Sequence, residues 1–201
     1  SWTHKFENKA GLYEKGQSNP VVESDTVSTD MNLTFFEKEG EQNAADGSKL
    51  DWTLTVDTTG TSSVDAYLID TIDASKLAYN MEKGITVHLE NGSTESITGL
   101  KEIRGEKAFT DLTIADMEGL VGTNSGVYYT YNNESIFIVP YKQNWVGQKI
   151  KVTYQTSIKD AGEKLENPEA PEAYGNTATM VWKNWKYGNG PEIDPFKFNI
   201  S

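Results

Sequence analysis

The amino-acid sequence predicts an all-β fold, an antiparallel β-sandwich with one short helix. Short runs rich in Thr, Val, Ile, Tyr and Trp alternate apolar and polar residues, as expected of strands that bury one face. Clusters of Gly, Asn, Asp and Ser separate these runs and supply the turns. Helical periodicity stands out in one segment, so we expect strands to dominate the fold.

The expected strands share this alternation and are bounded by turn residues. In the first of them, Trp52, Leu54 and Val56 fall on one face, while Thr and Asp fall on the other. The clearest strands are residues 50–56, 64–69, 84–89, 127–131, 135–139, 149–158 and 176–182.

The expected helix covers residues 112–120, with Asp111 or Thr113 as its N-terminal cap. Two segments are typical of loops. Residues 40–49 are polar and rich in Gly, Ala and Asn, and residues 161–173 are rich in Glu and Pro.

The chain of 201 residues is long enough for one large β domain with a substantial core. We expect residues 1–186 to form this domain. Residues 187–201, rich in Gly and Pro at their start, are expected to form an extension toward a following domain. With no targeting or anchoring motif in the sequence, we expect a domain excised from a longer surface protein.

Charge and composition exclude several classes of function. With 30 acidic and 18 basic residues, the net charge of −12 opposes binding to nucleic acid and to anionic lipid. No apolar run approaches the roughly 20 residues of a membrane span. The absence of cysteine excludes disulfides, and His4 and His88 are too far apart in sequence to form a recognisable metal motif. We therefore expect no metal and no cofactor.

Three short motifs carry the chemistry that we expect. They are Lys9-Ala10-Gly11, the apolar-flanked acid Ile69-Asp70-Thr71-Ile72, and a strand that begins at Asn176 and ends at Trp182. In this order, together with the strands around Trp52 and Tyr154, the sequence resembles the collagen-adhesin type of immunoglobulin-like domain from Gram-positive cell-wall adhesins.

This resemblance implies an immunoglobulin-like sandwich with a spontaneous Lys–Asn isopeptide bond. It implies that Lys9 and Asn176 are crosslinked and that Asp70 is the acid that promotes the reaction. The segment between residues 11 and 50 is longer than the family pattern suggests, so Lys5 is a competing nucleophile. Asp51 and Asp65 compete for the role of the acid.

The chemistry has a physical basis that does not depend on the family. A solvated lysine is protonated at neutral pH and cannot attack, but burial disfavours the ammonium. Burial also favours the protonated form of Asp70, which can then polarise the Asn176 amide and shuttle protons. The reaction occurs once in each molecule, so we expect no enzymatic turnover. The crosslink from Lys9 would close a loop that spans most of the chain.

The resemblance implies an extracellular surface module, with its cell-wall anchor outside this fragment. We expect it either to bind a host matrix protein or a glycan, or to act as a stalk that links neighbouring domains; no ligand-contact residue can be named. The alternative is a carbohydrate-binding module of a secreted protein, with a binding surface drawn from Trp145, Trp182, Trp185 and Tyr187. The pair Asp70 and Asp73 suggests glycosidase chemistry, but chance acidic pairs are common in so acidic a chain.

Overall fold

The structure is a computed structural model that describes residues 36–161 and 174–183, together with the backbone of short strands outside these ranges. The chain divides into two compact units, Ser1–Phe35 and Phe36–Ser201. In the first unit, β1 (Trp2–Asn8) pairs with β4 (Val27–Leu33), and β2 (Gly11–Leu12) pairs with β3 (Val22–Glu23). Both pairs are antiparallel.

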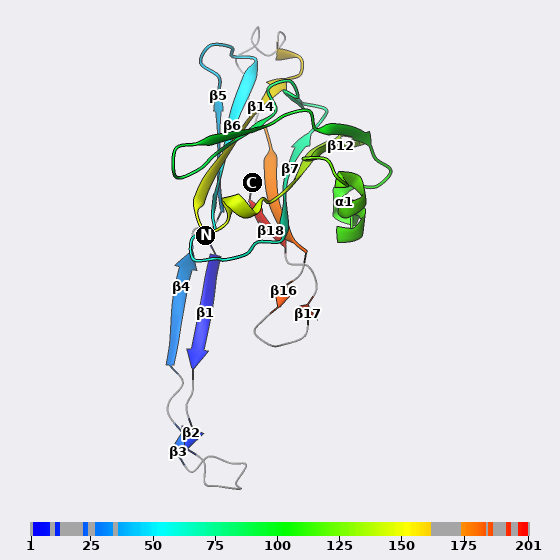
Figure 1. Cartoon of the computed structure of the whole chain (residues 1–201). Helices are drawn as coiled ribbons and strands as arrows, with labels where there is room; N and C mark the ends of the chain where they lie inside the picture. Colours follow the sequence, from blue (N-terminus) through cyan, green and yellow to red (C-terminus); the bar gives the residue numbers. More distant parts are fainter. Residues whose placement is uncertain are drawn as a thin grey trace. The chain divides into compact units, whose positions relative to one another are not determined.

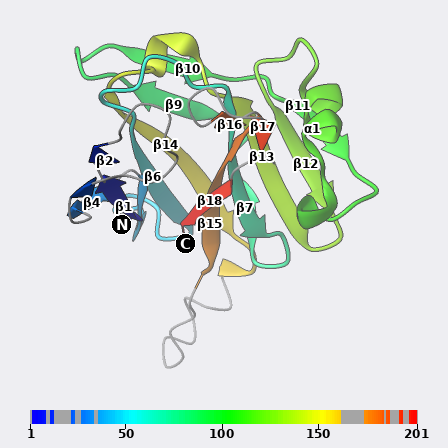
Figure 2. The same ribbon diagram turned by 90° about the horizontal axis from the view of Figure 1, so that it is seen from below.

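The second unit contains the two main sheets, which we call sheet 1 and sheet 2 (Figures 1 and 2). Sheet 1 has the order β10-β9-β14-β6-β5, and β8 also pairs with β14. Its strands are β5 (Phe36–Gln42), β6 (Lys49–Asp57), β8 (Leu77–Tyr79), β9 (Ile85–His88), β10 (Thr94–Ile97) and β14 (Lys149–Ile158).

Sheet 2 has the order β11-β12-β13-β7-β15-β18. Its strands are β7 (Ala66–Asp73), β11 (Lys101–Arg104), β12 (Val127–Tyr131), β13 (Glu134–Pro140), β15 (Asn176–Trp182) and β18 (Lys197–Ile200). A separate antiparallel pair joins β16 (Trp185–Lys186) to β17 (Glu192–Ile193). The pairing of β11 with β12 is parallel, and the other pairings in the described part of the chain are antiparallel.

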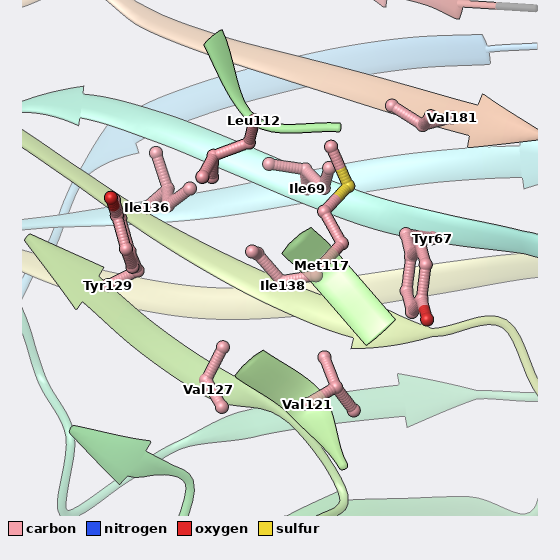
Figure 3. Close-up of a cluster of buried hydrophobic side chains, with 10 residues drawn as sticks. All are labelled: Tyr67, Ile69, Leu112, Met117, Val121, Val127, Tyr129, Ile136, Ile138 and Val181. Atoms are coloured by element: carbon pink, nitrogen blue, oxygen red, sulfur yellow. The ribbon is translucent and has the colours of Figure 1, made fainter. Parts of the chain in front are cut away.

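The helix α1 (Ile114–Val121) covers the outer face of sheet 2. Figure 3 shows Met117 and Val121 of this helix against Ile69, Ile136 and Ile138 of the sheet. A capping box fixes its start, because the Thr113 side chain accepts from the Asp116 amide while the Asp116 carboxylate accepts from the Thr113 amide. Two short 3₁₀ helices, η1 (Phe109–Asp111) and η2 (Gln143–Trp145), complete the elements.

The predicted all-β sandwich with one short helix is confirmed. Each predicted strand contains or overlaps an observed one, and the helix has the predicted Thr113 cap. The loop predicted at residues 40–49 was wrong at its start, because β5 continues to Gln42. Charged residues dominate β5, so it lacks the apolar alternation that identified the other strands. The loop predicted at residues 161–173 lies almost wholly outside the described residues.

The domain boundary predicted after residue 186 falls inside the second unit. Within the predicted extension, β18 pairs in register with β15 and extends sheet 2 by one strand. The role of residues 187–201 as a link to another domain stays a prediction.

Candidate functional site: a buried lysine, acid and amide between two sheets

Asp70 lies near the centre of sheet 2, on β7, between β13 and β15. It is opposite Phe137 on one side and Ala178 on the other. Since side chains alternate along a strand, Asp70 shares its face with the buried Leu68 and Ile72. Its exposed fraction is 0%, so this carboxyl group is in the dry core between the sheets.

Asn176 begins β15 and is brought to the same face of sheet 2. Ala178 is the register partner of Asp70, and Asn176 is two residues away along the strand. The Asn176 side chain is buried, and its Nδ2 donates to the hydroxyl of Tyr154 at 3.2 Å. Its Oδ1 is buried and has no hydrogen-bond partner among the described residues. An unsatisfied buried carbonyl is costly, which marks this amide as unusual.

The lysine that faces Asp70 is Lys38, on β5 of sheet 1. Its Nζ is 2.9 Å from Asp70 Oδ1, and only 3% of its side chain is exposed. The contact joins the two sheets, since β5 lies at the edge of sheet 1 and β7 lies inside sheet 2. A lysine, an acid and an amide therefore meet in one buried cluster, which we call the Lys38–Asp70–Asn176 cluster.

Gly40 and Trp52 explain how Lys38 is held. The two residues are register partners on β5 and β6, and the indole of Trp52 lies over Gly40. A Cβ atom on Gly40 would lie 2.4 Å from Trp52 Cζ3, so only glycine leaves room for the ring. The same ring is 5.3 Å from Lys38 Nζ, and its Nε1 donates to Thr156 Oγ1 at 2.9 Å. The indole therefore forms an apolar wall beside the lysine.

Two tyrosines of sheet 1 hold the carboxyl group of Asp70. Tyr154 donates to Oδ1 at 2.5 Å, and Tyr79 donates to Oδ2 at 2.7 Å. Both rings are buried, and each packs against Phe137. Each oxygen of the carboxyl group thus has a fixed donor, which sets its orientation.

Burial shifts the pKa values of these groups toward their neutral forms. Desolvation lowers the pKa of Lys38, although the nearby Asp70 opposes this shift. Desolvation raises the pKa of Asp70, opposed by Lys38 and by hydrogen bonds from both tyrosines. The pKa values of Tyr79 and Tyr154 are raised well above the ordinary value, first by burial and then by the charge of Asp70. Burial therefore shifts Lys38 toward the uncharged amine and Asp70 toward the carboxylic acid, and it keeps the phenols protonated.

This arrangement contains the groups needed for amide exchange. A neutral lysine is a nucleophile, a carboxylic acid can donate and accept protons, and a carboxamide is an acyl donor. Burial excludes competing water, and the rigid strands fix the reacting groups close together. No group of His, Cys, Asp or Glu that could hold a metal ion occurs among the described residues.

The structure places two of the predicted site residues, Asp70 and Asn176, on one buried face of sheet 2, but it gives no view of the predicted nucleophile. Lys9 lies outside the described residues, and only the backbone of Lys5 is described. The missed residue is Lys38, whose Lys38-Glu39-Gly40 motif repeats the Lys-x-Gly pattern closer to Trp52. The excessive length of the segment between residues 11 and 50 was the signal that could have identified it.

The competing acids lie elsewhere. Asp51 is partly exposed and accepts hydrogen bonds from Asn43 and Gln155. Asp65 is mostly exposed beside Lys183. Asp73 is exposed and binds Ser75 in a turn, so it does not form a catalytic pair with the buried Asp70.

The aromatic surface predicted for carbohydrate binding cannot include Trp145. Trp145 is fully buried, and its Nε1 donates to Glu95 at 3.1 Å. Trp182 is half-buried, while the side chains of Trp185 and Tyr187 lie outside the described residues. His88 contacts Thr153 at 3.0 Å, and the side chain of His4 is not described. No helix in the described part of the chain is long and apolar enough to span a membrane.

Comparisons with known proteins give distant structural likenesses. No protein-family model matches the chain, and no curated protein matches it. The chain is similar to the collagen-binding domain from a Staphylococcus aureus adhesin, with 16% identity and a TM-score of 0.42, over 85% of this chain and 97% of that one. It is also similar to the collagen-binding subdomain of the Enterococcus faecalis surface protein ACE, with 16% identity and a TM-score of 0.45, over 84% and 96%.

A third similar structure is the T6 backbone pilin of serotype M6 Streptococcus pyogenes. The identity is 16% and the TM-score is 0.47, over 98% of this chain and 42% of the pilin. These likenesses are too distant to assign a role to any residue, so the roles argued below rest on the geometry of the Lys38–Asp70–Asn176 cluster.

Proposed function

We propose that this chain is a module of a cell-surface adhesin, stabilised by an isopeptide bond between Lys38 and Asn176 that Asp70 promotes. The observation that carries the proposal is the buried contact of Lys38 with Asp70, on the face of sheet 2 that also carries Asn176. An ordinary structural ion pair does not require a buried amide with an unsatisfied oxygen beside it. Lys38 replaces Lys9 as the proposed nucleophile.

The proposed reaction forms one bond and breaks one. Lys38 first passes a proton to Asp70, which both pKa shifts favour. The neutral Nζ then attacks Cγ of Asn176, the Cγ–Nδ2 bond breaks, and Nδ2 leaves as ammonia. The proton that Nζ loses on becoming an amide balances the proton that the leaving nitrogen gains. The reaction occurs once, so the protein is not an enzyme in the sense of turnover.

The crosslink suits a protein that bears load outside the cell. It would join β5, the first strand of the second unit, to β15, on the opposite sheet. An amide crosslink survives reduction, and the chain contains no cysteine that could form a disulfide instead. We propose an extracellular location and a role in binding a host matrix protein or in linking neighbouring domains. Collagen is the ligand named for two of the similar structures.

Intact-mass spectrometry of the purified chain tests the crosslink. We expect a mass below the sequence mass by one ammonia. Lys38→Ala, Asp70→Ala and Asn176→Ala should each restore the full sequence mass, because each removes one reacting group. Fragmentation of a proteolytic digest should recover the peptides around residues 38 and 176 as one branched species.

Lys9→Ala and Lys5→Ala are the matched controls, and both should keep the mass deficit. If Lys9→Ala abolished the deficit while Lys38→Ala retained it, the nucleophile would be Lys9 and not Lys38. A wild-type chain with the full sequence mass would remove the crosslink from the proposal.

A further inference from the structure

Tyr154 lies between Asp70 and Asn176 in the Lys38–Asp70–Asn176 cluster. Its hydroxyl donates to Asp70 Oδ1 at 2.5 Å and accepts from Asn176 Nδ2 at 3.2 Å. Lys38 Nζ contacts the same Asp70 oxygen at 2.9 Å. One continuous chain of hydrogen bonds therefore runs from the attacking nitrogen, through the acid and the phenol, to the leaving nitrogen.

The leaving nitrogen needs a proton donor. An amide nitrogen is expelled readily only when it is protonated as its bond to carbon breaks. In the described part of the chain, no direct hydrogen bond joins the Asp70 carboxyl group to Asn176, and the described partner of Nδ2 is the Tyr154 hydroxyl. The acid that receives the proton of Lys38 therefore contacts the leaving group through Tyr154.

We propose that Tyr154 is a catalytic residue of the crosslinking reaction and relays a proton from Asp70 to the departing nitrogen of Asn176. The inference rests on the proposed Lys38–Asn176 bond. As the Cγ–Nδ2 bond breaks, the Tyr154 hydroxyl proton moves to Nδ2, which leaves as ammonia. Tyr154 takes the proton of Asp70, and Asp70 takes the remaining excess proton from Nζ. Tyr154 ends as it began, Asp70 ends protonated, and no co-reactant is consumed.

The setting of Tyr154 suits a relay. Its side chain is 4% exposed, and its ring meets Phe137 edge-on with centroids 5.0 Å apart, which fixes the direction of the hydroxyl. Burial keeps the phenol protonated, and a hydroxyl can both donate and accept. In the relay its two hydrogen bonds reverse, so that it accepts from the protonated Asp70 and donates to the departing Nδ2. Tyr79 differs from Tyr154 because it does not bridge the acid and the amide. Its hydroxyl binds Asp70, but no described contact joins it to Asn176.

The comparison of Tyr154→Phe with Tyr79→Phe tests the relay. Both variants lose one phenol that binds Asp70, and both keep a buried ring. The full-length chains are made by cell-free synthesis, samples are quenched in acid at intervals, and the loss of ammonia is followed by intact mass. We expect Tyr154→Phe to slow crosslinking by about 100-fold or more, as for loss of a general acid. Tyr79→Phe should slow it by less than about tenfold, as for loss of one hydrogen bond.

Two measurements separate catalysis from folding. In a Lys38→Ala background, which cannot crosslink, urea unfolding should show similar losses of stability for the two Phe variants. A difluorotyrosine placed at position 154 keeps the shape of the ring and makes the phenol a stronger acid. It should speed crosslinking when at position 154 and have little effect at position 79.

The outcomes are distinct. If wild-type chain crosslinks and the two Phe variants react at equal rates, or if difluorotyrosine at position 154 leaves the rate unchanged, the relay is wrong and the crosslink stands. If the wild-type chain keeps its full sequence mass, the crosslink fails, and the relay fails with it.

Discussion

At the scale of single residues, the main feature is a lysine and an acid that lie together in a dry core. Burying two charges costs more free energy than their attraction returns unless further hydrogen bonds compensate. Tyr79 and Tyr154 supply two such bonds to Asp70. In the proposed reaction, proton transfer from Lys38 to Asp70 removes both charges and leaves the amine able to attack. A buried ion pair of this kind adds little to the free energy of unfolding, but in the proposed reaction it supplies a neutral amine.

The raised pKa of Asp70 predicts a specific dependence of stability on pH. Lys38→Met removes the nearest positive charge, so the pKa of Asp70 should rise further above its ordinary value of 3.8. In the window above 3.8, the native state then keeps a proton that the unfolded state has lost. The free energy of unfolding should therefore decrease as pH rises, by at most about 1.4 kcal/mol per pH unit.

Urea unfolding of Lys38→Met between about pH 4 and about pH 8 measures this slope. Other carboxylates also titrate, so Lys38→Met/Asp70→Asn is the reference, and the difference between the two variants isolates Asp70. Equal pH slopes in the two variants would show that Asp70 ionises in the folded protein as it does in the unfolded one.

At the scale of elements, the contact of β5 with β6 places Lys38. The strand β5 buries little apolar surface of its own after Phe36, and its outer positions are glutamates. Its position depends on in-register pairing with β6 and on the fit of the Trp52 ring over Gly40. The Lys-x-Gly pattern is therefore a packing requirement, since the glycine makes room for the ring that shields the lysine.

Gly40→Ala should damage this contact. The added methyl group would overlap the Trp52 ring, and overpacking of a core typically costs about 1–3 kcal/mol. Urea unfolding in an Asn176→Ala background measures the effect without the crosslink. In the otherwise wild-type chain, the displaced ring should also slow the loss of ammonia.

Gly119→Ala is the matched control for this substitution. A Cβ atom at Gly119 meets no heavy atom within 4 Å, and the residue lies within α1. Alanine is favoured there by roughly 0.5–1 kcal/mol, so this variant should be slightly more stable. If both variants changed stability equally, the fit between Gly40 and Trp52 would not be the cause.

At the scale of the whole molecule, the proposed bond connects the two sheets through their core. It would close a loop of about 140 residues, for which the chain-entropy model gives about 5 kcal/mol of stabilisation. That value is comparable to the whole free energy of unfolding of many domains. The sandwich would therefore keep its topology under conditions that unfold an uncrosslinked chain of the same sequence.

We expect Asn176→Ala to lower the free energy of unfolding by several kcal/mol, far more than the roughly 1 kcal/mol of its single hydrogen bond. Urea denaturation of the two proteins, with and without a thiol reductant, measures the difference, and the reductant should have no effect. Lys9→Ala should unfold at the wild-type concentration of urea. A midpoint for Asn176→Ala equal to that of the wild type would contradict a stabilising crosslink.

The sequence by itself determined the class of fold and two members of the cluster. Strands such as β6 can be recognised from the sequence, because the alternating apolar residues Trp52, Leu54 and Val56 share one buried face. Asp70 stood out as an acid between the apolar residues Ile69 and Ile72. Asn176 stood out at the start of the last long strand, but only the register of β15 against β7 in the structure places both residues on one face.

Only the tertiary structure shows that Lys38 is the described lysine that contacts Asp70. Local pattern describes which face a residue takes on its own strand, but the contact of Lys38 with Asp70 depends on how two sheets pack against each other. The strand β5 gave no apolar alternation, so its inward face could not be recognised from its own residues. Sheet packing brings together residues that are distant in sequence. It places Lys38, Tyr79 and Tyr154 around Asp70, contacts that no pattern within a single strand predicts.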